Sequence, residues 1–319
     1  MQSVLKRSNS RPAKMTLAHQ PVLYHEIIHA LGPTSGGRYI DGTLGAGGHA
    51  AGILTASSPD GLLLGLDVDP DALTLARQNL TTFGERAFIR QASYTTLRQQ
   101  MSTLGWQTVN GILLDLGASS LQFDNPERGF SFLGDGPLDM RFNPEYPFTA
   151  ASIVNSWSEA DLADVIYRYG EEPASRRIAR AIVRKRPFTR TKDLAALIEQ
   201  TIGRRGGHHP ATRTFQALRI AVNEELEAIT EVLPLALQAL ETGGRLAIIS
   251  FHSLEDRLVK ETFRRESRDC LCPPAQPICT CGHKATLKEV SRRPIVPCPA
   301  EVQENPRSRS AKLRVAEKL

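Results

Sequence analysis

Short apolar runs alternate with segments of helical periodicity along the first third of the chain. Leu62–Leu66 is a continuous apolar run, which is typical of a strand buried on both faces of a parallel sheet. Asp69 and Pro70 follow it as an N-cap and a first helical residue, so a helix is predicted from there to about Leu80. The same reasoning predicts a helix over His19–Leu31 and strands over Arg38–Ile40, Ala87–Arg90 and Gly111–Leu116. Strand–helix–strand units of this length predict a doubly wound, mostly parallel α/β sheet.

The pattern changes between Asn125 and Glu224, where no parallel strand is predicted. Helical segments are predicted there and just beyond, over Glu159–Tyr169, Pro173–Arg186, Thr191–Thr201 and Thr212–Ala239, the last with a break near Pro234. Strand character returns at Arg245–Phe251. We therefore predict a disordered basic tail (residues 1–18), a first α/β part (19–124), an all-helical insertion (125–224) and a second α/β part (225–319).

The composition and the distribution of charge indicate what kind of partner the protein can bind. The chain has 319 residues, of which 41% are hydrophobic, and no apolar run of about 18 residues that would span a membrane. Its net charge of +5 is compatible with a polyanionic partner. Eight basic residues and no acid lie between Arg176 and Lys192, and a second basic region runs from Lys284 to the end. A charge run is often only a solvated face, but two of them favour contact with phosphate groups.

The five cysteines all lie in the last fifty residues. An odd, clustered set is not typical of a disulfide framework, so a reducing, cytoplasmic compartment is predicted. Four of the cysteines have His283 close behind and are of a type and density suited to tetrahedral zinc; they are Cys270, Cys272, Cys279 and Cys281. The single residue between the members of each pair is tighter spacing than usual. A Pro-rich loop of reduced thiols (residues 270–283) is therefore the alternative.

Two strand–loop junctions carry the candidate chemistry. The first strand runs into the glycine-rich segment Asp41–His49, and glycines let a backbone approach a ligand closely. Asp67 ends the second strand, where a carboxylate can accept hydrogen bonds from both hydroxyls of a ribose. Asp115 ends the fourth strand and is expected to face the same crevice. NAD and S-adenosylmethionine both carry such a ribose, and the spacing alone leaves both open.

Longer motifs resemble one family closely. The sequence is similar to the RsmH/MraW family of bacterial 16S rRNA cytosine-N4 methyltransferases over nearly everything after residue 18. The matching segments are His19–Leu23, Tyr39–Thr43 with Gly45 and Gly47–His49, Gly111–Gly117, Glu127–Phe132, Asp135–Arg141, Tyr169–Glu172, His209–Ala217, Ser250–Arg257 and Glu304–Ser310.

The resemblance implies a class I S-adenosylmethionine-dependent methyltransferase fold, Rossmann-like, with an inserted helical substrate domain. It implies methylation of N4 of a cytidine in the decoding region of 16S rRNA, with the small ribosomal subunit as partner. The cofactor contacts that it implies are Gly47, Gly48, His49, Asp67, Tyr94, Asp115 and Gln122. Tyr94 stands where the family commonly has Phe, and Leu121 stands where Pro commonly precedes Gln122.

Two catalytic candidates follow. His252 comes just after the fifth strand, at the predicted crevice, and Asp139 lies in the long loop of the insertion. A carboxylate or carbonyl that accepts a hydrogen bond from N4–H would localise the lone pair of the amine, and positioning would supply most of the acceleration. His252 as a group that only binds backbone, and Asp139 as the ion-pair partner of Arg141, are the structural alternatives.

Other functions stay open at this point. A nicotinamide-dependent oxidoreductase would use the same two junctions, and a non-catalytic RNA-binding assembly factor would retain the basic runs. The oligomeric state is likewise open, with a homodimer among the states to test.

A target base in RNA must leave its stack to reach the pocket, which favours single-stranded or flipped RNA.

Overall fold

A computed structural model describes residues 21–204, 207, 209–274, 276 and 278–319. The predicted basic tail (1–18), with the start of the predicted helix at His19, lies outside the described residues. The centre of the molecule is a seven-stranded sheet in the order β3-β2-β1-β4-β5-β7-β6. Its strands are β1 (Arg38–Asp41), β2 (Leu62–Asp67), β3 (Ala87–Gln91), β4 (Val109–Asp115), β5 (Leu240–Ser250), β6 (Leu287–Glu289) and β7 (Lys312–Lys318).

The strand pairing confirms the mostly parallel α/β sheet. Strands β1 to β5 pair in parallel, with Ile40 level with Leu64 on one side and with Ile112 on the other. β7 is antiparallel to both β5 and β6. The chain order reverses between β1 and β4, and an open sheet binds its ligand beyond the carboxyl ends of the strands at such a switch point. The sequence predicted neither β6 nor β7.

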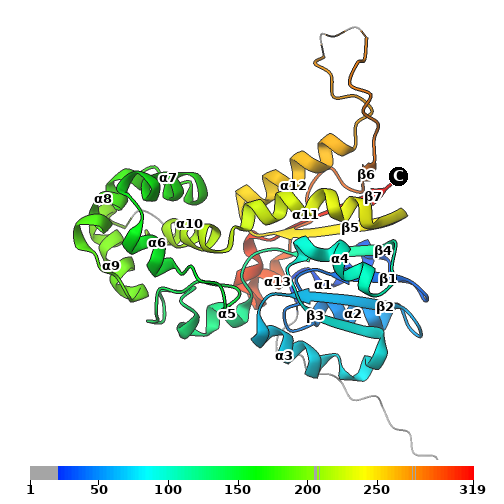
Figure 1. Cartoon of the computed structure of the whole chain (residues 1–319), viewed down its shortest axis with the longest axis horizontal. Helices are drawn as coiled ribbons and strands as arrows, with labels where there is room; N and C mark the ends of the chain where they lie inside the picture. Colours follow the sequence, from blue (N-terminus) through cyan, green and yellow to red (C-terminus); the bar gives the residue numbers. More distant parts are fainter. Residues whose placement is uncertain (1–20, 205–206, 208, 275, 277) are drawn as a thin grey trace, which may run out of the picture.

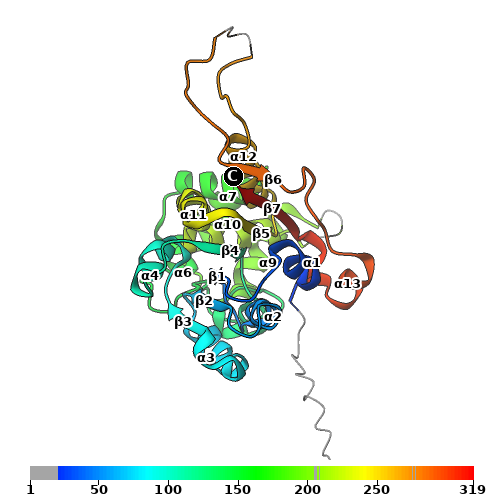
Figure 2. The ribbon, with the colours of Figure 1, turned by 90° about the vertical axis from the view of Figure 1, so that its right-hand side faces the viewer.

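Helices cover both faces of the sheet (Figure 1 and Figure 2). Two apolar clusters fill the space between sheet and helices. One face carries α1 (Tyr24–Leu31), α2 (Gly48–Ala56) and α3 (Pro70–Asn79), with α13 (Pro299–Glu304) beside α1; the other carries α4 (Leu97–Thr103), α11 (Glu225–Ala239) and α12 (Ser253–Glu266). Short elements complete this part: η1 (Thr81–Arg86), η2 (Tyr94–Thr96), α5 (Ser120–Asp124) and η4 (Pro306–Ser310). A further short element, η3 (Pro126–Arg128), lies at the start of the insertion.

The helical insertion stands beside the sheet as a separate lobe (Figure 1). A third apolar cluster, whose buried members run from Phe130 to Val222, forms its core. Between Asn125 and Glu224 the described residues contain no strand, only an isolated bridge between Pro137 and Arg190. Its helices are α6 (Ala150–Ser156), α7 (Glu159–Gly170), α8 (Ser175–Lys185), α9 (Thr191–Ile202) and α10 (Thr212–Asn223).

One predicted break was wrong. The helical segment after Thr212 is interrupted at Glu224, which adopts a left-handed conformation (φ 50°), and not at Pro234, which lies inside α11. Pro234 is exposed, so water can reach the backbone carbonyl that its missing N–H leaves unpaired. Glu224 instead marks the point where the chain leaves the insertion and returns to the sheet.

Between α12 and β6 the chain leaves the body as an extended projection (Figure 1), which we call the arm (residues 267–286). The arm carries four of the cysteines. Among the described residues, no helix is long and apolar enough to cross a membrane.

Candidate active site

Three carboxylates lie at the carboxyl ends of neighbouring strands. Asp41 ends β1, Asp67 ends β2 and Asp115 ends β4. Burial raises the pKa of Asp41 to about 7, and burial together with Asp41 and Glu255 raises the pKa of Asp115 to about 8. The pKa of Asp67 is also raised, again mainly by burial. Neighbouring carboxyl groups with raised pKa values favour a cationic ligand, because a positive charge would let them ionise.

Asp67 shapes the glycine turn as well as facing the crevice. Its Oδ2 accepts a hydrogen bond from the Gly45 amide (2.7 Å), and its Oδ1 accepts one from the Asp69 amide (2.9 Å). Each carboxylate oxygen has a second lone pair. Asp67 can therefore hold the turn and still accept a ribose hydroxyl. The helix-capping role belongs to Asp69, whose side chain accepts from the Asp71 amide, as predicted.

Glycine is needed at the turn for two reasons. Gly45 and Gly47 have positive φ angles of 52° and 83°. A Cβ on Gly48 would clash with the ring of Pro21. The helix α2 that starts here has no side-chain cap, so the amides of its first turn are not engaged by a capping side chain. The turn thus offers close backbone approach and amide donors, as an adenosine-bearing cofactor requires.

His49 and Asp115 form an unpaired buried couple. His49 Nε2 lies 3.7 Å from Asp115 Oδ2. Both ring nitrogens of His49 and Oδ1 of Asp115 are buried without a hydrogen-bond partner among the described residues. Burial lowers the pKa of His49 to about 4, so its imidazole is neutral at pH 7. Buried polar atoms that lack partners are costly, which favours a ligand that satisfies them.

His252 and Glu255 form a second couple at the start of α12. His252 Nδ1 accepts from the Glu255 amide, and Glu255 Oε2 accepts from the Phe251 amide (2.7 Å). This capping box leaves His252 Nε2 facing Glu255 Oε1 at 3.2 Å, with both atoms buried and neither satisfied by a well-aligned hydrogen bond. Because Nδ1 accepts, Nε2 carries the proton. The pair therefore offers one N–H donor and one carboxylate acceptor side by side.

This second couple lies close to the β4 loop. A Cβ on Gly117 would be 3.8 Å from both Glu255 Oε1 and a guanidinium nitrogen of Arg219. Arg219 in turn makes two 2.8 Å hydrogen bonds to the buried Glu225, at the start of α11. Burial alone would raise the pKa of Glu255, but His252 and Arg219 bring it below its usual value. Glu255 is therefore an ionised acceptor beside Asp115.

The remaining predicted residues are placed differently. Tyr94 packs over Gly42, and burial, then Glu225 and Glu255, raise the pKa of its hydroxyl. The Gln122 side chain donates to Asp69 (2.9 Å) and accepts from the Ser119 amide (2.9 Å). Its amide is thus engaged by the protein, and its contact with a cofactor stays a prediction.

Asp139 lies apart from the two couples. Its carboxylate binds the Arg141 guanidinium at 2.8 and 2.7 Å, and its carbonyl accepts from the Ala150 amide. These are the contacts of a residue that orders the loop, the structural alternative considered for it. None of its described contacts reaches His252 or Asp115.

Sequence reasoning missed Glu255, Arg219 and Glu225. Glu255 looks like an ordinary capping-box residue three positions after His252, and nothing in the sequence places Arg219 beside it. Asp41 lay within the glycine-rich motif without a role of its own. Asp41 could have been found from the sequence, because it ends a strand in the same way as Asp67 and Asp115.

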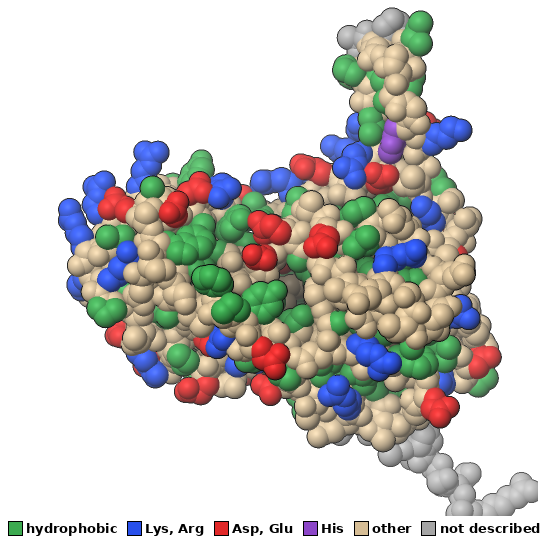
Figure 3. Space-filling view, in the orientation of Figure 1, with side chains coloured by type: hydrophobic (Ala, Val, Ile, Leu, Met, Phe, Trp, Pro, Cys, Tyr) green, Lys and Arg blue, Asp and Glu red, His purple; other side chains and the backbone are tan. Residues whose placement is uncertain are grey.

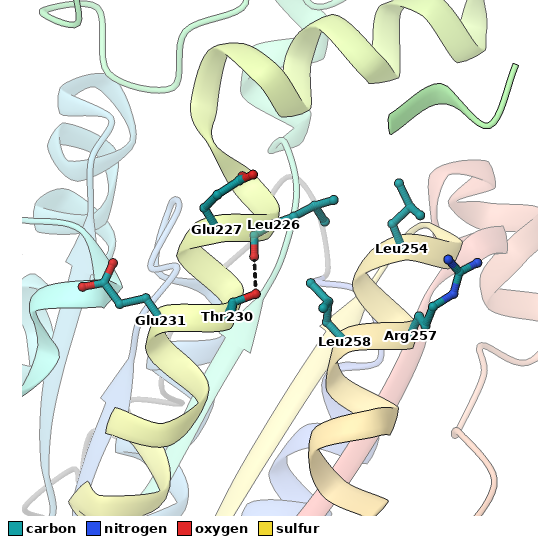
Figure 4. A pocket seen from close by; sticks show the side chains of 7 residues that line it. All are labelled: Leu226, Glu227, Thr230, Glu231, Leu254, Arg257 and Leu258. Carbon is teal, nitrogen blue, oxygen red and sulfur yellow. Dashed lines mark hydrogen bonds between the residues drawn. The ribbon is translucent and has the colours of Figure 1, made fainter. Parts of the chain in front are cut away.

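A separate groove of about 490 Å³ lies between α11 and α12. Figure 4 shows Leu226, Leu254 and Leu258 pointing into it. None of the residues predicted for the cofactor or for catalysis lines this groove.

The four cysteines of the arm lie together. Their sulfur atoms are all within 4.8 Å of one another. Cys270 Sγ lies 3.4 Å from Cys279 Sγ and 3.9 Å from Cys281 Sγ, and the last two are 3.6 Å apart. A tetrahedral zinc site with Zn–S bonds of about 2.3 Å places its sulfurs about 3.8 Å apart. The thiols therefore fit the geometry of a zinc ion despite their tight spacing in the sequence.

Comparison with known proteins shows the family to which this chain belongs. The model of the MraW methylase family matches residues 16–319. The chain belongs to the MraW methylase family. Among its relatives, the ribosomal RNA small subunit methyltransferase H of Dehalococcoides mccartyi is 52% identical over 302 residues, which are 94% of this chain and 86% of that protein. The protein of the same name from Geobacter sulfurreducens is 51% identical over 311 residues, 96% of this chain and 100% of that one.

Membership of the MraW methylase family makes the chain an S-adenosylmethionine-dependent methyltransferase. The predicted fold class and the resemblance are confirmed, and the oxidoreductase and assembly-factor alternatives find no support. Solved structures are more distant. A putative rRNA methylase from Clostridium thermocellum covers 92% of this chain and 95% of its own, with a TM-score of 0.45 and 11% identity. A putative methyltransferase from Streptococcus mutans in complex with SAH has a TM-score of 0.43 and 12% identity.

Proposed function

We propose that this MraW methylase family member methylates the exocyclic N4 amine of a cytidine in 16S rRNA of the small ribosomal subunit. The relatives bear the name of a small-subunit rRNA methyltransferase. The observation that carries the proposal is the set of buried, unpaired polar atoms on Asp115, His49, His252 and Glu255, which lie beyond the strand ends where the fold binds its ligands. Such a substrate would be met in the cytoplasm.

The cofactor residues of the proposal are Gly47, Gly48, His49, Asp67, Tyr94, Asp115 and Gln122. When bound, S-adenosylmethionine supplies an electrophilic methyl group on a positively charged sulfur. The glycine turn fits this compound because it precedes α2, whose first-turn amides are not engaged by a capping side chain. Asp115 fits it because its buried carboxyl would be stabilised in the ionised form by a neighbouring cation.

The His252–Glu255 couple matches the edge of a cytosine. Cytosine presents the N4 amine as a donor beside the ring N3 acceptor. Glu255 Oε1 can accept from N4–H while the His252 Nε2–H donates to N3, and the two protein atoms are 3.2 Å apart. The carboxylate would localise the lone pair of the amine and receive the proton that the amine loses on methylation. His252 then acts by positioning the base, and Asp139 by ordering the loop.

The test is methyl transfer from radiolabelled S-adenosylmethionine to small subunits taken from cells that lack the enzyme. We expect label in 16S rRNA, recovered as N4-methylcytidine after nucleoside digestion. Subunits from cells that contain the enzyme are the matched control, because their target is already methylated. Label in another nucleoside, or none at all, would refute the proposal. Calorimetry with NAD in place of S-adenosylmethionine separates the oxidoreductase alternative.

We also propose a structural zinc ion bound by Cys270, Cys272, Cys279 and Cys281. The support is the sulfur spacing described above. The zinc would brace the arm and take no part in methyl transfer. Metal analysis of the purified protein should give one zinc per chain, lost in a Cys270→Ser, Cys279→Ser double variant. Light scattering tests whether the protein is a monomer or a homodimer.

A further inference from the structure

The arm is joined to the active site by a single helix. α12 begins beside His252 and has 14 residues. At a rise of about 1.5 Å per residue, it places the root of the arm about 20 Å from the His252–Glu255 couple. Figure 1 and Figure 2 both show the arm projecting from the end of this helix, away from the body. The root of the arm lies near the amino ends of the strands, since Leu287 is level with Lys318 and Glu317 with Arg245. A small ribosomal subunit is far larger than this distance, so it can extend from the couple to the root of the arm.

Three of the four acids in residues 260–293 are engaged by the arm itself, and the fourth, Glu261 on α12, is exposed. Glu266 accepts from Arg265 and from the Thr286 hydroxyl, and its carbonyl accepts from the Thr286 amide. Asp269 accepts from the Ala285 amide, and Glu289 from the Ser267 hydroxyl. These contacts hold the two ends of the arm together.

The basic residues of this region are left facing solvent. Residues 260–293 contain eight Lys or Arg and four Asp or Glu. Arg264, Arg268 and Lys284 are exposed, and none of the three has an ion-pair partner among the residues that the structure describes. Figure 3 shows Lys and Arg side chains around the root of the arm, and others at the outer end of the helical insertion. The chain thus has two separate groups of exposed basic residues, one at the outer end of the insertion and one at the root of the arm.

We propose that the exposed basic residues at the root of the arm, Arg264, Arg268 and Lys284, bind the phosphate backbone of the substrate rRNA, as a second contact separate from the basic helix α8. This inference rests on the proposed function. Exposed guanidinium and ammonium groups that have no ion-pair partner are suited to phosphate, and two separated contacts fix the orientation of an RNA better than one. The four-thiol site would keep the arm rigid, so that little conformational entropy is lost on binding.

The test compares two double variants with equal loss of charge. Arg268→Gln with Lys284→Gln removes two charges from the arm. The control, Arg77→Gln with Arg98→Gln, removes two exposed charges from α3 and α4. Binding of protein-free 16S rRNA is measured as a function of salt, and KM and kcat are measured with small subunits. For the arm variant, we expect a salt slope lower by about 0.7 to 0.9 for each phosphate group that is no longer bound, a several-fold higher KM and an unchanged kcat.

A third variant, Cys270→Ser with Cys279→Ser, should raise KM for subunits and leave the dissociation constant for S-adenosylmethionine unchanged. If the arm variants match the control in salt slope and KM while the wild type methylates subunits, the arm proposal is wrong. If binding to subunits weakens but binding to protein-free rRNA and its salt slope do not change, the arm contacts a ribosomal protein, which also overturns it. A wild type that transfers no methyl group to rRNA refutes the proposed function instead.

Discussion

At the residue scale, burial changes the protonation of Asp115. Its pKa is raised to about 8, so at neutral pH the carboxyl group is mostly protonated before a cofactor binds. Its burial is what separates it from an ordinary surface aspartate, whose carboxyl group is ionised at that pH.

Binding of S-adenosylmethionine should therefore release a proton from Asp115. As pH falls below about 8, the carboxyl must first be deprotonated, so the dissociation constant should rise by up to about tenfold per pH unit. S-adenosylhomocysteine, which lacks the positive charge on sulfur, should show a shallower dependence. Calorimetry from about pH 6 to 9 measures both, with Asp115→Asn as the variant that removes the titrating group. Equal slopes for the two ligands would contradict this role of Asp115.

His252 and Asp139 should separate in kinetics. His252→Ala removes the donor beside Glu255 and should lower kcat by about 10²-fold or more, with cofactor binding retained. Asp139→Ala breaks only the pairing with Arg141, so KM for subunits should rise more than kcat falls. Single-turnover methyl transfer and calorimetry check both variants. A wild-type kcat for His252→Ala would remove it from the chemistry.

At the scale of elements, α8 presents its basic residues outward. Ile178, Ala179 and Ile182 face the core of the insertion, while Arg176 and Arg184 are exposed. Arg180, which lies between them on the same helix, pairs with Glu159 at 3.3 Å. Other basic residues of the run are structural, because Arg186 donates to two carbonyls and Arg190 binds Asp135.

Replacing Arg176 and Arg184 by Gln should lower the salt slope of rRNA binding by about 1.5, since each phosphate group that the protein binds accounts for about 0.7 to 0.9. Stability should hardly change, as surface substitutions of this kind usually alter it by less than about 0.5 kcal/mol. Arg186→Gln is the informative contrast, because it should destabilise the fold by removing its two hydrogen bonds to carbonyl groups. If the salt slope of rRNA binding is unchanged in the Arg176→Gln, Arg184→Gln variant, the exposed face of α8 contacts only solvent and does not bind RNA.

At the scale of the whole molecule, one buried ion pair lies where the insertion joins the sheet domain. Arg219 belongs to α10 of the insertion and Glu225 opens α11. Both interact electrostatically with Glu255: Arg219 lowers the pKa of Glu255, and Glu255 raises the pKa of Glu225. The pair therefore links the position of the helical insertion to the His252–Glu255 couple.

Arg219→Gln should reduce the free energy of unfolding by about 3 to 5 kcal/mol, because it leaves Glu225 buried without its partner. Arg257→Gln breaks the exposed ion pair with Glu171 and should cost less than about 1 kcal/mol. Denaturant unfolding measures both. Equal destabilisation by the two variants would show that the buried pair has no special weight.

Local sequence is enough to specify the order of strands and helices over most of the chain. Continuous apolar runs of this length are typical of buried parallel strands, and Asp69 with Pro70 specifies where α3 begins. The glycine turn and the acids at strand ends could also be predicted, because both follow from local backbone requirements and from the parallel sheet. The family resemblance added the identity of the cofactor.

Tertiary packing determines several features that local sequence patterns do not predict. Only packing places Arg219 and Glu255 together against Gly117, from segments far apart in the chain. The break at Glu224 instead of Pro234 depends on where the insertion rejoins the sheet, and the short antiparallel strands β6 and β7 depend on the edge of β5. The same holds for the four thiols, whose sulfur spacing comes from the folded arm. These features depend on contacts between residues far apart in the chain, which the periodicity of hydrophobic residues in a short segment cannot predict.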